Sequence, residues 1–220
     1  MTDDTGTTRW LFADQLGPHF DDGDPLLLIE ARSVFERRTY HRQKAHLILS
    51  ALHHRAANDP ERVTLIRSQT YAEGVTTYRD SSHRDLDAIA ATSRPARRLV
   101  ERLGLSTIHP ERGWFTTPGE FQAWVTGRGD KRLLMEDWYR GVRSRHDVLM
   151  ADGKPEGGKW NFDHDNRLPP PKGETHLPVP TPWQPVEDDI DAQVRQQLDE
   201  WEAQGIRFLG QDGPRRFAVT

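Results

Sequence analysis

Short apolar runs alternate with helix-like patterns over the first hundred residues of the chain. The apolar runs predict strands at residues 9–13, 26–30, 63–67 and 88–91, with a candidate fifth at residues 106–109. Continuous apolar character at the second of these runs is typical of a strand that is buried on both faces. The pattern therefore predicts the α/β class, with a Rossmann-like open parallel sheet of about five strands and helices on both faces.

A long helix is predicted between the second and third strands. Its apolar residues recur at helical spacing and should pack on the sheet; they are Ala45, Ile48, Leu49, Leu52 and Ala56. The opposite face is polar and carries Gln43, His46, Ser50, His53 and His54. We interpret these histidines, together with His41, as solvated side chains on the helix surface. A metal site is the alternative, but spacings of five and seven residues do not present two ligands on one face as an i, i+4 pair does.

Further helices are predicted from their start and stop signals. One begins near Pro95 and meets Gly104, where a left-handed cap is needed. Residues 117–120 supply an N-cap, a first-turn proline and a capping-box acid for the next. A helix at about residues 132–145 should bury Leu134, Trp138 and Val142. A last amphipathic helix, at about residues 187–204, aligns Ile190, Val194, Leu198 and Trp201 and has acids in its first turn.

Eight of the 15 prolines lie between residues 151 and 185, which excludes a regular helix or a central strand there. We interpret this stretch as an extended connector laid over the surface. The predicted organisation is therefore an α/β domain at residues 1–150, followed by a connector with a C-terminal helix at residues 151–220.

Composition excludes several classes of function. The sequence has no cysteine, so these 220 residues cannot form disulfides or ligate an iron–sulfur cluster through thiolates. No apolar run approaches the roughly 20 residues that span a bilayer, and the first five residues lack the features of a secretion signal. We therefore expect a cytoplasmic protein that does not contact the membrane. A net charge of −4 gives no general attraction to nucleic acid.

Several motifs occur in an order that resembles a known family. The sequence LFADQL at residues 11–16 is followed by IE at residues 29–30, YHRQK at residues 40–44 and SAL at residues 50–52. LMEDWYR at residues 134–140 and the distinctive GGKWNFDHDNR at residues 157–167 follow later. This order resembles the photolyase-related family that contains the bacterial (6-4) photolyases and the cryptochromes with an iron–sulfur cluster.

The resemblance implies that the chain corresponds to the front part of the family. Family members continue into a helical half that holds FAD, binds DNA and supplies four cysteine ligands to a [4Fe–4S] cluster. We therefore expect an N-terminal antenna-chromophore and docking part that is not catalytic by itself, whose parent protein is a photolyase or a cryptochrome. Its expected partner is the flavin-binding helical half, in the same chain or a separate one, and DNA would be bound only through the full-length protein.

The resemblance also implies a site for a lumazine-type antenna pigment at the strand ends. The residues that it assigns to this site are Asp14, Gln15, Leu16, Ile29, Glu30, Val34, Arg37 and Ile48. The chain departs from the lumazine-binding relatives at Val34 and Arg37, where those relatives carry an acid and a tyrosine, so the hydrogen bonds to a pigment would differ. The alternatives are a strand-end turn residue for Asp14 and core packing for Ile48.

Other functions remain open on the residues alone. The chain could be a free-standing small-molecule-binding or protein-interaction module derived from this domain, without photochemistry. A hydrolase or transferase is less favoured, because no phosphate loop, nucleophile elbow or acid/base pair is present. Residues 163–165 are better interpreted as structural than as a cation loop. Trp160 and Phe162 are interpreted as anchors of the connector in preference to base-stacking platforms.

Overall fold

The computed structural model describes residues 6–163, 169, 171–173, 179–181, 183–218. The chain divides into two compact units, Met1–Arg112 with Pro182–Thr220 and Gly113–Thr181. The sequence predictions for residues 164–167 lie outside the described residues. The boundary predicted after residue 150 falls within the second unit, and the two units are described separately below.

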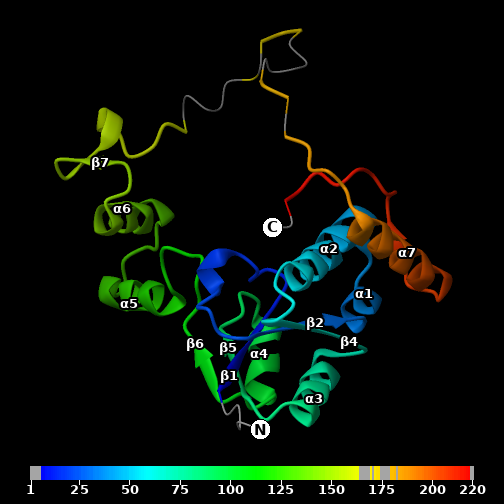
Figure 1. Ribbon diagram of the computed structural model, residues 1–220. Helices are drawn as coiled ribbons and strands as arrows, with labels where there is room; N and C mark the ends of the chain where they lie inside the picture. Colours follow the sequence, from blue (N-terminus) through cyan, green and yellow to red (C-terminus); the bar gives the residue numbers. More distant parts are fainter. Residues whose placement is uncertain (1–5, 164–168, 170, 174–178, 182, 219–220) are drawn as a thin grey trace. The chain divides into compact units, whose positions relative to one another are not determined.

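Five parallel strands form the sheet of the first unit (Figure 1). They are β1 (Thr7–Leu11), β2 (Leu26–Ala31), β4 (Val63–Ser68), β5 (Asp85–Ile89) and β6 (Thr107–His109). Their order in the sheet is β4-β2-β1-β5-β6, so the direction in which strands are added reverses between β1 and β5. This is the strand order of a Rossmann-like sheet, and the predicted fold class is confirmed.

Helices cover both faces of this sheet (Figure 1). The first unit contains α1 (Ser33–Arg37), α2 (Arg42–Asn58), α3 (Tyr71–Ser81), α4 (Arg94–Arg102) and α7 (Asp189–Ala203). One core cluster joins the sheet to α3 and α4 and includes Trp10, Leu27 and Ile29, whereas a second joins it to α2 and includes Leu28 and Leu52. The two clusters use alternate residues of β2, as the two-residue period of a strand requires.

Strands β1 and β5 begin earlier than the apolar pattern predicted. β1 starts at Thr7 and pairs with β5, which starts at Asp85. Asp87 lies within β5 and is buried. The burial of this charge is tolerated because the Arg9 guanidinium on β1 donates to its carboxylate at 3.2 and 3.0 Å. A charged pair in the centre of the sheet therefore interrupts the apolar run from which the strand was predicted.

The helix α7 packs on α2, and this contact corrects one interpretation of the sequence. His46, His53 and His54 are 2%, 6% and 4% exposed, so the interpretation of these histidines as solvated was wrong. Carboxylates face these three histidines: Asp191 faces His46, Glu30 faces His53 and Asp188 faces His54. These contacts compensate the imidazole rings for the hydration that they lose on burial. Burial lowers the pKa of His46, which favours the neutral ring. A third core cluster, with Ala45, Leu49, Val194 and Leu198, completes the contact.

Arg42 joins α2 to α7 through ion pairs at the edge of their contact. Its guanidinium is buried and forms ion pairs with Asp199, with Glu202 at 2.8 Å and with Asp212 at 2.8 Å. The burial pattern predicted for the last helix is confirmed, because Val194, Leu198 and Trp201 are buried. Its N-terminus carries a capping box formed by Asp188 and Asp191.

A loop carboxylate gives the first unit a pH-dependent contribution to stability. Arg62 donates to both oxygens of Asp21, at 2.6 and 2.7 Å, and together with the backbone N–H of Gly23 and the charge of Arg55 it lowers the pKa of Asp21. Because the folded-state pKa is depressed, the stabilisation is present above the ordinary value of 3.8 and is lost as the pH falls below it.

We expect the substitution Asp21→Asn to lower the urea midpoint at pH 7 and to have a smaller effect as the pH is lowered past 3.8. The measurement is urea denaturation of both proteins over a pH series. An equal midpoint at pH 7, or a difference that grows toward acid pH, would contradict the expectation.

The second unit contains α5 (Pro118–Arg128), α6 (Met135–His146), the two-stranded pair β7 (Met150–Ala151) and β8 (Lys154–Pro155), and a 3-10 turn at Glu156–Gly158. The capping box of Thr117 and Glu120 is present as predicted. The ring of Trp138 lies 5.2 Å from those of Phe121 and Trp124 and joins α6 to α5. Leu134, predicted to be buried, is 41% exposed, because it is the N-cap that precedes α6. Trp138 and Val142, predicted to be buried with it, are half-buried.

Arg143 attaches the segment after the 3-10 turn to α6. Its side chain is buried and donates to the carbonyl oxygens of Val148 at 3.0 Å and of Trp160 at 2.9 Å. The guanidinium also lies 5.5 Å from the centre of the Trp160 ring, a cation–π distance. Trp160 is therefore held by its backbone and by its ring.

We expect Trp160→Ala to raise the protease sensitivity of the chain near residues 156–163, because the ring contact with Arg143 is lost. Limited proteolysis followed by mass spectrometry measures the cleavage sites. Trp114→Ala, at a side chain that is 69% exposed, is the matched control. The same digestion pattern in wild type and Trp160→Ala would count against the anchoring role.

Among the helices that the structure describes, none combines the length and the apolar character of a membrane-spanning segment.

Candidate functional site

The ends of β1 and β5 are joined by side chains of the DQL turn. Gln15 is 1% exposed; its amide oxygen accepts from the backbone N–H of Phe12 at 3.1 Å, and its amide nitrogen donates to the carbonyl oxygens of Ile89 and Ala90. Asp14 accepts from the hydroxyl of Thr92 at 2.8 Å. These bonds span the point where the strand order reverses, which is where open α/β sheets bind ligands.

Aromatic side chains lie beside this turn. The ring of Tyr71, the first residue of α3, lies 5.3 Å from that of Phe12 and 5.6 Å from that of Trp10. Burial raises the pKa of Tyr71 to about 12, with smaller contributions from the nearby Tyr40 and Asp14. Its hydroxyl therefore stays protonated at neutral pH and can donate a hydrogen bond. Sequence reasoning missed Tyr71, although its place directly after a strand and a Thr70 N-cap was a usable signal.

The remaining predicted residues lie on both sides of the sheet. Ile29 is buried in the cluster under α3, whereas Leu16 and Ile48 pack in the cluster under α2. Val34 contacts both the α3-side cluster and the cluster between α2 and α7. Arg37 donates to the carbonyl oxygen of Ser33 at 3.2 Å. The eight predicted residues therefore do not share a single surface.

Glu30 belongs to a separate, buried polar network. It is 3% exposed, its Oε2 lies 2.6 Å from His53 Nε2, and its Oε1 accepts from the amide of Gln197 on α7. The Arg67 Nε lies 3.7 Å from the same carboxylate. Each oxygen of this buried acid therefore has a partner, as a buried charge requires.

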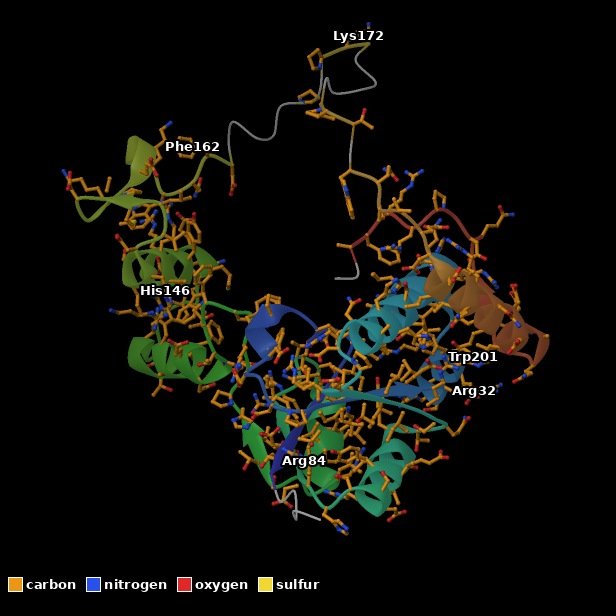
Figure 2. All side chains as sticks on the ribbon, viewed as in Figure 1. Arg32, Arg84, His146, Phe162, Lys172 and Trp201 are labelled. Atoms are coloured by element: carbon orange, nitrogen blue, oxygen red, sulfur yellow. The ribbon has the colours of Figure 1, made fainter. Side chains whose placement is uncertain are left out.

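A cavity of about 480 Å³ opens next to Glu30, at the carboxyl ends of β2 and β4. It is lined by Glu30, Arg32, Arg67, Ser68, Gln69, Gln193, Gln196, Gln197, Glu200 and Trp201. Figure 2 shows Arg32 beside Trp201, and the guanidinium carbon is 5.9 Å from the ring centre. The volume is within the range of small-molecule sites, and the lining offers guanidinium and amide donors, carboxylate acceptors and one aromatic face.

Of the residues that line this cavity, sequence reasoning named only Glu30 as a site residue and predicted Trp201 only as an apolar position of the last helix. The others come from β4 and the residue after it, from the chain after β2 and from α7, and no local motif joins them. On α7, the polar side of the amphipathic pattern supplies Gln193, Gln196, Gln197 and Glu200. The sequence did not indicate that this side faces the ends of β2 and β4.

The fold and the polar groups at its strand ends define an α/β protein of the Rossmann type with ligand-sized space at the carboxyl edge of the sheet. Residues 9–206 match the family described as deoxyribodipyrimidine photo-lyase-related protein, and the chain belongs to this family. The resemblance inferred from the sequence motifs is therefore confirmed.

A curated relative gives a second comparison. A segment of 62 residues, 28% of the chain, is 44% identical to a (6-4) photolyase from Agrobacterium fabrum (strain C58). The segment covers 12% of the length of that photolyase.

Proposed function

We propose that this chain is the antenna and docking part of a photolyase- or cryptochrome-like flavoprotein that acts in light-dependent DNA repair or light sensing. The observation that carries the proposal is the family match over residues 9–206, on a sheet with Rossmann strand order. The relative named as a (6-4) photolyase supports the connection to repair of DNA. In this proposal the chain is not catalytic by itself.

The photochemistry would belong to a helical half that holds FAD and a [4Fe–4S] cluster. The 220 residues contain no cysteine, so the thiolate ligands of such a cluster must come from outside this sequence. That half, in the same chain or a separate one, is the proposed partner, and DNA would be bound through the complete protein. Exposed apolar side chains of the second unit, including Trp114, Phe115 and Met135, are candidates for docking it.

The proposed pigment, a lumazine-type antenna, would lie at the end of β1. The proposal is supported by two polar groups near this end of the sheet. The Asp14 carboxylate accepts from Thr92 where the strand order reverses, and burial keeps the Tyr71 phenol protonated, with Asp14 and Arg37 as minor influences on its pKa. Val34 and Ile48 would supply apolar contacts. Flat heterocycles need such a set of apolar contacts and a few oriented donors.

Absorption and fluorescence spectroscopy test this proposal. We expect the purified chain, alone or after addition of a lumazine, to show an absorption band beyond that of protein, together with one pigment per chain. The double substitution Asp14→Ala and Arg37→Ala should weaken binding by at least about tenfold, since two charged or hydrogen-bonding groups are removed. A chain that binds no lumazine would contradict the antenna role.

A stand-alone small-molecule-binding module is the second candidate, and the polar cavity next to Glu30 favours it. A ligand in this cavity would contact Trp201, whereas a pigment at the end of β1 would not depend on it. Trp201→Ala should therefore abolish binding in the second case, and Arg37→Ala should leave it unchanged.

A further inference from the structure

A cluster of one histidine and two carboxylates lies where the N-terminus of α7 meets α2. His54 comes from α2, Asp188 is the N-cap of α7, and Asp191 is in its first turn. Each offers a ligand atom, and these atoms all lie within 4.8 Å of one another. His54 and Asp191 are buried, whereas the Asp188 side chain is 53% exposed and opens the cluster to solvent.

The hydrogen bonds of His54 decide which of its ring nitrogens faces the carboxylates. Its Nδ1 lies 2.7 Å from the carbonyl oxygen of Ser50, and because a carbonyl can only accept, Nδ1 carries the hydrogen. Its Nε2 lies 3.0 and 3.2 Å from the two oxygens of Asp188. In a neutral ring this nitrogen is an acceptor that faces two other acceptors. The contact is therefore satisfied either by a second proton, which makes the ring an imidazolium paired with Asp188, or by a metal cation.

A ring held in this way has the arrangement of a metal ligand. Histidines that bind metals donate their other ring nitrogen to a backbone carbonyl or a carboxylate, which fixes the tautomer and aims the free lone pair at the ion. The hydroxyl of Ser50 continues the same network by donating to Asp191 Oδ1 at 3.1 Å.

A second buried histidine is directed at the same cluster without forming a hydrogen bond to it. His46 is 2% exposed, and its Nε2 has no hydrogen-bond partner among the described residues although it lies 3.1 Å from Asp191 Oδ1. The other oxygen of Asp191 accepts from Arg215 at 3.0 Å. Oδ1 is therefore the oxygen toward which both α2 side chains, Ser50 and His46, are directed.

We propose that His54, Asp188 and Asp191 bind one divalent cation of the Zn²⁺ class. Imidazole nitrogen together with carboxylate oxygen suits Zn²⁺, and three protein ligands leave a fourth position for water at the exposed side of Asp188. The ion would join the beginning of α7 to the end of α2. It binds outside both the strand-end region and the polar cavity, and the proposal does not depend on the antenna role.

Isothermal titration of the complete chain, stripped with a chelator, with ZnCl₂ measures the proposed site. We expect one equivalent of Zn²⁺ to bind, a higher Tm in its presence, and loss of that shift with EDTA. His54→Gln should weaken binding by at least about tenfold, because a ligand atom is lost. Co²⁺ in place of Zn²⁺ should give a visible absorption band that the same substitution removes.

Two further variants make the test independent of folding defects. Asp188→Asn keeps a good N-cap for α7 while removing the carboxylate charge, so circular dichroism should be unchanged and Zn²⁺ binding should fall by at least about tenfold. His83→Gln, at an exposed histidine outside the cluster, should bind as wild type does. No stoichiometric binding by the wild type would show that His54 holds only a proton, and unchanged binding in both cluster variants would place the ion elsewhere; either result overturns the proposal.

Discussion

Replacing Arg9 with alanine is expected to lower the free energy of unfolding by about 3 kcal/mol or more. The guanidinium lies in the centre of the sheet with its side chain 4% exposed, and it neutralises Asp87, whose side chain is 6% exposed. Removing one partner of a buried pair leaves the other without most of its compensation. His109, whose Nε2 lies 2.6 Å from the same carboxylate, is then its remaining partner. Urea denaturation at pH 7 measures the loss.

The matched control is an ion pair of the same kind on the surface. Arg140 pairs with Glu136 at 3.0 Å while its side chain is 47% exposed, and Arg140→Ala should change stability by no more than about 0.5 kcal/mol. Adding Asp87→Leu to an Arg9→Leu variant should recover part of the loss, because a hydrophobic pair can replace a buried ion pair. If Arg9→Ala and Arg140→Ala lowered the free energy of unfolding equally, burial would not be what makes the Arg9 ion pair important for stability.

Replacing Leu198 with alanine is expected to cost about 2–5 kcal/mol of unfolding free energy. Leu198 is 0% exposed and lies in the cluster between α2 and α7 with Leu49 and Val194. Truncation leaves a cavity between α2 and α7. The ion pair between Arg42 and Glu202 holds the two helices in place, so they cannot move together to fill the cavity, which raises its cost. Urea denaturation monitored by tryptophan fluorescence measures the change, since Trp201 lies in the same cluster.

Leu209→Ala is the corresponding control, because this leucine is 58% exposed. We expect its effect to stay within about 0.5 kcal/mol of wild type. Hydrogen exchange should also show that the α2 amides lose protection in Leu198→Ala. If α2 keeps its protection while global stability falls, α7 does not shield this helix in the way the packing indicates.

The sheet could be predicted because its central strands are locally apolar. Residues 26–29 are buried on both sides and read as one continuous hydrophobic run. The start of β5 could not be read in the same way, because the acceptability of Asp87 inside the sheet depends on Arg9, which is far away in the sequence. A local sequence pattern predicts burial well when many neighbouring residues are apolar. It does not predict a buried charge whose partner is far away in the sequence.

The polar face of α2 shows the same limit for the candidate sites. His46, Ser50 and His54 recur every four residues and would face water on an isolated helix. What buries them is the acidic first turn of α7, whose own sequence indicated only a favourable interaction with the helix dipole. The strand-end residues Asp14 and Gln15 were located by the DQL turn, whereas the cavity beside Glu30 required the position of α7.

The packing of α7 on α2 also sets an order of events during synthesis. α2 ends at Asn58, whereas α7 begins only at Asp189, so the ribosome must translate the intervening segment before Leu49 and the histidine face can be covered. At about 5–20 residues per second this corresponds to a wait on the order of 10 s, during which the leucine-bearing face of α2 stays uncovered. The first long helix of the chain therefore reaches its final packing only after α7 has been made, and a chaperone could bind its exposed face during that interval.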